Sequence, residues 1–229
     1  FDSGVLKGRT MFVMDAQTAT HVLLADNLGQ MFIVDTKASG LEIVSLTTID
    51  KTRQYAEIIC KDVPADLLEL SSLCAEPISR SIDAGRIMLA ADTLGASQAM
   101  INQAVDYAKE RKQFGRSIAD FGAIQEKIAS MGTNIEASRL LIHNAALLKD
   151  MHKPFTKEAA MAKSFASQTA MDAATDCVQI FGGYGYTKDQ GIEQLYRDNR
   201  ITPIYEGTNS VQAIDLVFRK LVNKNGNII

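Results

Sequence analysis

Tryptophan is absent from this 229-residue chain, and cysteine is limited to three residues. Cys60, Cys74 and Cys177 are an odd number without CxxC spacing, and they stand among apolar neighbours, which indicates reduced structural thiols. The sequence shows no signal peptide, and no uncharged apolar run approaches the ~20 residues of a membrane span. We therefore expect a protein without a membrane span, in the cytoplasm or, in a eukaryote, the mitochondrial matrix.

An excess of either charge is also lacking, because 24 basic residues stand against 27 acidic ones. A formal net charge of -3 gives no electrostatic footprint for nucleic acid or for an anionic membrane. Any phosphate must therefore be met by a few placed groups. The three histidines, His21, His143 and His152, are far apart and form no metal-binding spacing, so we predict no metal site.

The first 62 residues have a strand-like pattern punctuated by Gly, Asn and Asp. We predict a partial antiparallel β-domain at residues 1–62, with strands at 10–14, 21–25, 30–35, 41–46 and 54–61. Five strands with two open edges make a poor domain by themselves. Another chain or an N-terminal segment is therefore expected to cover the sheet.

A linker at residues 63–76 leads to a region with helical periodicity. The pattern predicts helices over 77–109, 122–150, 156–181, 190–200 and 208–223, bounded by Pro154, the Gly182-Gly183 pair and Pro203. Apolar residues recur at spacings of three and four, which is typical of an antiparallel bundle. The predicted fold class is α+β, mostly α, with a four-helix-type bundle domain at 77–229.

Glu206 stands on a short turn in Ile204-Tyr205-Glu206-Gly207-Thr208. A carboxylate beside a glycine that permits close approach of a substrate suits a general base. The alternative is structural, because Thr208 is a good N-cap and an acid just before a helix stabilises its dipole. On local sequence alone, capping is the favoured interpretation.

A basic segment, Glu110-Arg111-Lys112-Gln113-Phe114-Gly115-Arg116, follows the first long helix. A guanidinium held at a turn is a good bidentate clamp for a pyrophosphate. The alternative is that the cations complement the helix C-terminus and that Gly115 is the C-cap.

The glycine-rich segment Gln179-Ile180-Phe181-Gly182-Gly183-Tyr184-Gly185-Tyr186 ends a helix, unlike a GxGxxG loop, whose glycines precede one. It permits close approach of a ligand, although an ordinary C-cap would look the same. Arg197 and Asp198 are interpreted as a structural ion pair. Asp83 and Arg86, one turn apart, are either a solvated ion pair or a ligand clamp.

The order and spacing of these motifs, from Tyr107 to Gly115, Gln179 to Tyr186, Tyr196-Arg197-Asp198 and Tyr205-Glu206-Gly207-Thr208, closely resemble the acyl-CoA dehydrogenase family. The resemblance covers nearly the whole chain. It corresponds to the late part of that family's middle β-domain and to its C-terminal helical domain. The family's N-terminal helical domain, which supplies much of the flavin cradle, has no counterpart here.

The resemblance implies an FAD-dependent flavoprotein of fatty acid metabolism that converts an acyl-CoA to the trans-2-enoyl-CoA. Glu206 would remove the α proton, and the Gly207 backbone could contact the acyl group. The position that carries the base in some members is Gly85 here, which leaves Glu206 as the candidate. Asp83 and Arg86 would reach the CoA side of the substrate.

The resemblance also implies an FAD site shared between subunits, and hence a homo-oligomer, a dimer or a tetramer. Electron-transferring flavoprotein would be the electron acceptor, and a further chain or segment would supply the N-terminal domain. The residues that would contact the neighbour's pyrophosphate and adenosine are Arg111, Gln113 and Phe114. The residues that would complete the adenine-end contacts are Gln179, Ile180, Phe181, Gly182, Gly183, Thr208 and Ser210.

Two positions depart from the family pattern. Gly122 stands where an FAD-contacting glutamine is usual, and Met14 where a hydroxyl often lies near the flavin. These departures favour an alternative, a catalytically degenerate member acting as an assembly or regulatory subunit. A DNA-binding branch of the fold is disfavoured because no basic stripe is evident. Monooxygenases of the fold typically lack a Glu at this turn, and oxidases stay open.

Overall fold

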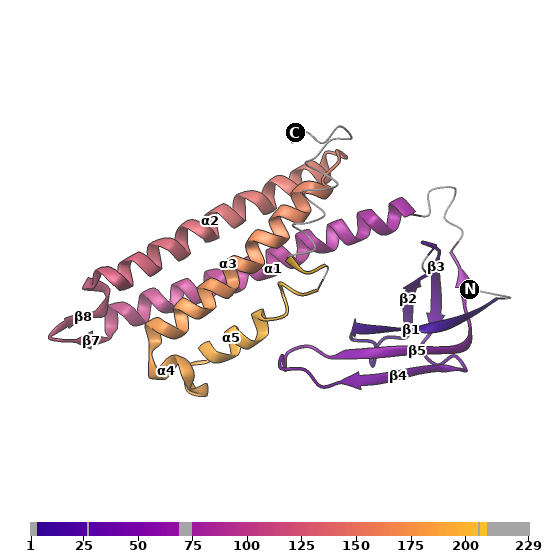
Figure 1. Cartoon of the computed structure of the whole chain (residues 1–229), viewed down its shortest axis with the longest axis horizontal. Helices are drawn as coiled ribbons and strands as arrows, with labels where there is room; N and C mark the ends of the chain where they lie inside the picture. Colours follow the sequence, from indigo (N-terminus) through magenta and orange to yellow (C-terminus); the bar gives the residue numbers. More distant parts are fainter. Residues whose placement is uncertain (1–3, 27, 69–74, 206, 210–229) are drawn as a thin grey trace. The chain divides into compact units, whose positions relative to one another are not determined.

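The structure is a computed structural model that describes residues 4–26, 28–68, 75–205 and 207–209. The chain divides into two compact units, residues 1–80 and 81–229. Figure 1 shows strands in the first unit and long helices in the second. This is the predicted α+β, mostly α fold.

The described part of the first unit contains two antiparallel three-stranded sheets with strand orders β1-β5-β4 and β2-β3-β6. Their core includes the fully buried side chains of Phe32, Val34, Ile58 and Val63. The strands are β1 Val5–Met14, β2 His21–Ala25, β3 Met31–Asp35, β4 Leu41–Leu46, β5 Tyr55–Pro64 and β6 Asp66–Leu67. All five predicted strands are confirmed.

Strand β1 begins at Val5, whereas the sequence pattern predicted residue 10. The prediction was too short because bulges interrupt the alternation of side chains in this strand. Its register against β5 shifts between Leu6 and Gly8 and again between Thr10 and Val13. A bulge inserts a residue and breaks the alternation that marks a strand in sequence. The two-residue strand β6, which pairs with β3, lies within the stretch predicted as the linker.

Three long helices lie side by side in the helical part of the chain, and the middle one in sequence, α2, runs antiparallel to α1 and α3 (Figure 1). They are α1 Ala75–Glu110, α2 Gly122–Asp150 and α3 Thr156–Phe181. At 36 residues, α1 is about 54 Å long. The bounds of α2 and α3 are those predicted. The last predicted helix, 208–223, lies almost wholly outside the described residues.

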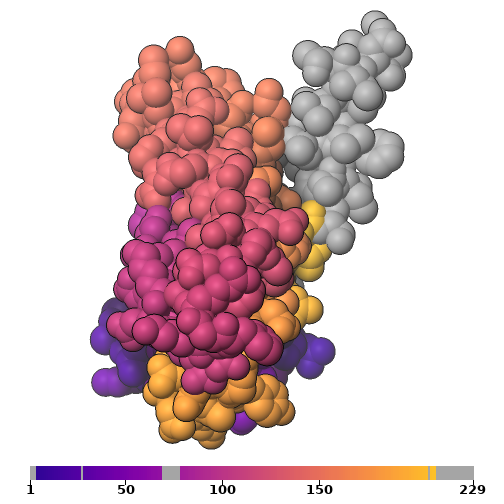
Figure 2. Space-filling view, turned by 90° about the vertical axis from the view of Figure 1, so that its left-hand side faces the viewer, coloured from indigo at the N-terminus to yellow at the C-terminus, as the bar shows by residue number. Residues whose placement is uncertain are grey.

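Alanine makes up seven of the thirteen buried residues of α3. These small side chains let the helix approach its neighbours closely, and both core clusters that contain α3 residues also include residues of α1 and α2. Helix α3 leads into the short α4 Gly183–Tyr186, the 3-10 turn η2 Lys188–Gln190 and α5 Ile192–Asn199. Figure 2 looks onto this end of the bundle, where α4 and α5 lie beside the α1–α2 connection.

That connection is a hairpin, β7 Lys112–Gln113 and β8 Arg116–Ser117, followed by the 3-10 turn η1 Ile118–Asp120. Phe114 and Gly115 form its turn with φ of 54° and 79°. Positive φ at both central residues is the signature of a type I′ hairpin. The suggestion that Gly115 is the C-cap of the first helix is therefore wrong, because that helix ends at Glu110.

Candidate functional site

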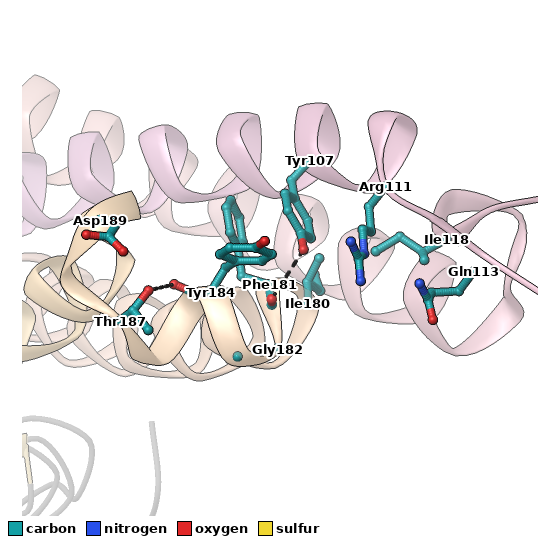
Figure 3. A pocket seen from close by; sticks show the side chains of 11 residues that line it. Tyr107, Arg111, Gln113, Ile118, Ile180, Phe181, Gly182, Tyr184, Thr187 and Asp189 are labelled. Carbon is teal, nitrogen blue, oxygen red and sulfur yellow. Dashed lines mark hydrogen bonds between the residues drawn. The ribbon is translucent and has the colours of Figure 1, made fainter.

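A pocket of about 490 Å³ opens where the C-terminal ends of α1 and α3 meet the hairpin (Figure 3). Arg111 and Gln113 lie at one end, Thr187 and Asp189 at the other, and aromatic rings between them. The lining residues are Tyr107, Arg111, Gln113, Ile118, Ile180, Phe181, Gly182, Gly183, Tyr184, Thr187 and Asp189. Segments about 70 residues apart in sequence thus meet at one surface.

The hairpin is held onto the end of α1 by local hydrogen bonds. The Arg111 amide donates to the Tyr107 carbonyl at 2.9 Å, and the Ile118 amide donates to the Arg111 carbonyl at 2.8 Å. The Ser117 hydroxyl donates to the Ala108 carbonyl at 2.7 Å. The backbone that carries Arg111 is therefore fixed on both sides, which places this side chain at the edge of the pocket.

The opposite wall is built by the glycine-rich end of α3. Gly182 has φ 59° and ψ -130°, a conformation that favours glycine, and its amide donates to the Val178 carbonyl. The rings of Tyr107 and Phe181 stack with centroids 4.2 Å apart, which joins α1 to α3. A Cβ at Gly182 or Gly183 would meet no heavy atom within 4 Å, so the backbone there is open to a ligand.

The basic and acidic side chains of the pocket lie at opposite ends. The Arg111 guanidinium and the Gln113 carboxamide can donate to phosphate oxygens at one end. The Asp189 carboxylate at the other end would repel phosphate but can accept hydrogen bonds from sugar hydroxyls. The arrangement suits an elongated ligand with an anionic part and a neutral polar part.

Six of the predicted cofactor residues line this pocket: Arg111, Gln113, Ile180, Phe181, Gly182 and Gly183. Phe114 does not line it, and its ring is 93% exposed at the tip of the hairpin. Gln179 and Thr208 are exposed and also lie outside the lining. Glu206 and Ser210 lie outside the described residues.

Tyr107, Tyr184, Thr187 and Asp189 line the pocket, although the sequence did not single them out as ligand contacts. Tyr107 and Tyr184 belong to the quoted motifs, so their proximity to a site could have been inferred. Asp189 carries no signal in the sequence, because a surface Lys188-Asp189 pair is ordinary. Only the turn after α4 brings it to the pocket.

The segment that follows Glu206 is held by a buried lysine of α3. Lys163 is 0% exposed, and its Nζ donates to the Gly207 carbonyl at 2.8 Å and to Asn209 Oδ1 at 3.3 Å. Lys163 was not among the site residues predicted from the sequence. Its signal was a cation in the middle of the small, apolar stretch Ala160-Met161-Ala162-Lys163-Ser164-Phe165-Ala166.

Asp83 and Arg86 form an ion pair with Nη1 2.7 Å from Oδ1. Asp83 is 1% exposed and the Arg86 side chain is largely buried, so the solvated alternative is wrong. The part in CoA binding stays a prediction. In α5, Arg197 forms a bidentate ion pair with Glu193, at 2.6 and 3.2 Å. The hydrogen bond from Arg197 lowers the pKa of the Glu193 carboxyl.

Cys60 and Cys177 are free and buried, as predicted for structural thiols, and Cys74 lies outside the described residues. Burial, reinforced by the Asp176 charge, raises the pKa of Cys177 to about 12. A thiol that stays protonated is a poor nucleophile. In the described ranges, no three His, Cys, Asp or Glu side chains gather as a metal site would need, and none of the helices could cross a bilayer.

Comparison with known proteins places the chain in a family. Residues 76–221 match the acyl-CoA dehydrogenase C-terminal domain. The chain is 38% identical to the 3-(aryl)acrylate reductase of Clostridium sporogenes, over 93% of this chain and 60% of the relative. A segment covering 59% of the chain is 50% identical to the Caffeyl-CoA reductase-Etf complex subunit CarC of Acetobacterium woodii, over 36% of that protein.

Among solved structures, the chain resembles butyryl-CoA dehydrogenase from Megasphaera elsdenii with a TM-score of 0.87 and 34% identity. The alignment covers 93% of this chain and 59% of that one. The chain therefore belongs to the acyl-CoA dehydrogenase family. It spans about six tenths of the length of the relatives that match along nearly all of it.

The family is flavin-dependent, and the pocket can be tested for its fit to one part of FAD. The guanidinium and carboxamide donors suit a pyrophosphate, the open backbone at Gly182 and Gly183 allows close approach, and Asp189 suits a ribose hydroxyl. The residues present thus fit the adenosine-diphosphate part of the cofactor.

Proposed function

We propose that this chain is the C-terminal part of an FAD-dependent acyl-CoA dehydrogenase, which converts an acyl-CoA thioester to the trans-2-enoyl-CoA. The observation that carries the proposal is the convergence of Arg111, Gln113 and the Gly182-Gly183 backbone on one pocket. Family membership supports the same reaction class, and the remainder of the flavin site would come from an N-terminal domain supplied by another segment or chain.

Glu206 is the proposed general base. Its carboxylate would remove the α proton of the thioester, whose acidity is low unless the carbonyl receives hydrogen bonds and water is excluded. FAD, when bound, would accept the hydride that leaves the β carbon. Gly207 has φ 88°, so the backbone next to Glu206 takes a conformation suited to glycine.

Arg111, Gln113 and Phe114 are proposed to hold the pyrophosphate and adenosine of a neighbouring subunit's FAD. The 93% exposed ring of Phe114 supports this proposal, because a large aromatic side chain at a hairpin tip is available to a second molecule. The proposed assembly is a homo-oligomer, and the proposed acceptor is electron-transferring flavoprotein. The name of the Acetobacterium woodii relative, an Etf complex subunit, supports that acceptor.

A second candidate is the reverse reaction, reduction of an enoyl-type double bond. The names of two relatives, a 3-(aryl)acrylate reductase and a caffeyl-CoA reductase subunit, favour it. The same base, acting as an acid, would deliver a proton to the α carbon as hydride arrives at the β carbon.

The test is Glu206→Gln in the flavin-loaded assembly that includes the N-terminal domain. This change keeps the shape of the side chain and removes its basicity, so FAD content stays the same and bleaching of the flavin by acyl-CoA slows at least about 10³-fold. The control is Glu136→Gln, which changes an exposed carboxylate on α2 and leaves bleaching intact. Bleaching of Glu206→Gln at the wild-type rate would refute the assignment.

A further inference from the structure

Lys163 is fully buried near the middle of α3, in a bundle whose core is otherwise built mainly from apolar and small residues. Burying an ammonium group is costly unless hydrogen-bond acceptors replace its water. A structural position in an alanine-rich helix would be filled more cheaply by an apolar side chain. We therefore expect the role of this charge to lie in the groups that the ammonium binds.

Two acceptors of its ammonium group belong to the segment that follows α5. Nζ lies 2.8 Å from the Gly207 carbonyl oxygen and 3.3 Å from Asn209 Oδ1. The same Oδ1 lies 3.0 Å from the Ser167 hydroxyl, and Asn209 Nδ2 donates to the Ser164 carbonyl at 3.3 Å. One turn of α3, residues 163–167, thus binds both the backbone and a side chain of the segment 207–209.

The hydrogen bond from Lys163 acts on Gly207, where the backbone by itself is least restricted. Gly207 has no Cβ and a φ of 88°, so its own sterics allow a wide range of conformations. A charge-assisted hydrogen bond to its carbonyl fixes the peptide plane between residues 207 and 208. Farther back, the Asn209 amide donates to the Pro203 carbonyl at 3.0 Å, which closes the loop around residues 203–209.

We propose that Lys163 is a positioning residue, whose ammonium, together with Ser167 and Asn209, holds the backbone that follows the base in the orientation that catalysis requires. This inference rests on the proposed function, because Glu206 is bonded directly to Gly207. A misplacement of about 1 Å at a reacting group can lower a rate about 10²-fold. Loss of the anchor would therefore lower the rate of proton removal more than substrate binding.

The first experiment needs neither flavin nor substrate. Hydrogen–deuterium exchange of residues 201–209 is compared in the wild type and in Lys163→Met, which keeps an unbranched side chain one atom shorter and removes its donors. We expect exchange at the Tyr205 and Asn209 amides to rise at least tenfold while α2 and the β-sheets keep wild-type rates. The matched control is Lys127→Met, which removes a lysine paired with Asp176 elsewhere in the bundle and leaves this segment unchanged.

The second experiment uses the flavin-loaded assembly. In Lys163→Met the limiting rate of flavin bleaching falls about 10²-fold, the acyl-CoA concentration at half-saturation stays within twofold, and Lys163→Arg recovers part of the rate. If Lys163 had a merely structural role, Lys163→Met would not lower the bleaching rate selectively over the half-saturation concentration.

Unchanged exchange at residues 201–209 in a folded Lys163→Met variant would overturn the proposal. If that variant does not fold, Asn209→Ala decides, because it removes the side-chain half of the anchor and should also accelerate exchange. Faster local exchange in a protein whose wild type never bleaches with any acyl-CoA would refute the proposed function and support the anchor.

Discussion

Gly185 shows how closely single residues are packed beneath the candidate pocket. A Cβ at this position would lie 2.6 Å from the Val178 carbonyl oxygen and 3.0 Å from the Phe181 Cβ. Both are less than the separation of atoms in contact, and the nearest atom is backbone, which cannot rotate away. The glycine therefore allows the chain after Gly182 to fold back against the last turn of α3.

Gly185→Ala should lower the free energy of unfolding by about 1–3 kcal/mol, because overpacking forces the backbone to shift. Gly95→Ala is the matched control, since it also lies in a helix and its Cβ would meet no atom within 4 Å. There the gain in helix propensity should stabilise the protein by about 0.5–1 kcal/mol. Urea denaturation of both variants measures the difference, and equal stabilities would contradict this account of the close contact.

At the scale of an element, the β7–β8 hairpin combines an unfavourable conformation with an exposed ring. Phe114 has φ 54°, a region where an aromatic residue is uncommon, and its side chain is 93% exposed. Its nearest aromatic neighbour, Phe121, is edge-on at 6.3 Å, and Arg116 lies over Phe121 at 4.2 Å. Packing within the chain therefore does not explain the phenylalanine, whereas contact with a second molecule would.

Phe114→Asn should distinguish the effect of this residue on the stability of the hairpin from its proposed effect on FAD binding. Asparagine favours positive φ, so the free energy of unfolding should stay within about 0.5 kcal/mol of the wild type or rise. In the flavin-loaded assembly, loss of the stacking ring should weaken FAD binding about tenfold. Thermal melts and flavin titration provide the two measurements. A variant that loses stability but keeps its FAD affinity would show that the ring serves the hairpin alone.

The same scale shows why some elements were predictable. Helices α2 and α3 have the predicted bounds because Gly122, Pro154 and Gly182 act locally, through backbone conformation. The β7–β8 hairpin was not predicted, because its strands are two residues long and highly charged. The hairpin depends on Ser117 and Ile118 bonding back to α1, and these contacts have no signature in sequence.

On the scale of the whole molecule, α2 carries an exposed apolar stripe. The stripe consists of Leu140 and Leu147 of α2 and of Met151, its C-cap residue. Their spacing of seven and four residues places them on one side of the helix, and they are 69%, 58% and 51% exposed. An exposed row of large apolar side chains is typical of an interaction surface. It supports the proposed homo-oligomer, in which a second copy would cover this stripe.

Replacement of both Leu140 and Leu147 by Glu should shift the molecule toward smaller assemblies, because two carboxylates would be buried without partners. Light scattering after size-exclusion chromatography measures the mass. Lys149→Glu places a carboxylate at an exposed position on the opposite side of the same helix and should leave the mass unchanged. An unaltered oligomer in the double variant would place the interface elsewhere.

The sequence alone determined the fold class, the long helices, the main strands and the family, because each depends on local periodicity, on glycine and proline, or on the order of short motifs. It also identified six residues of the pocket. Tertiary structure alone decided which motif residues share a surface, brought Asp189 to it, and showed Asp83 to be buried. It also joined Lys163 to Gly207 across 44 residues of sequence, at 2.8 Å. Such contacts depend on how helices pack and turns fold back, and this information is spread over the whole core.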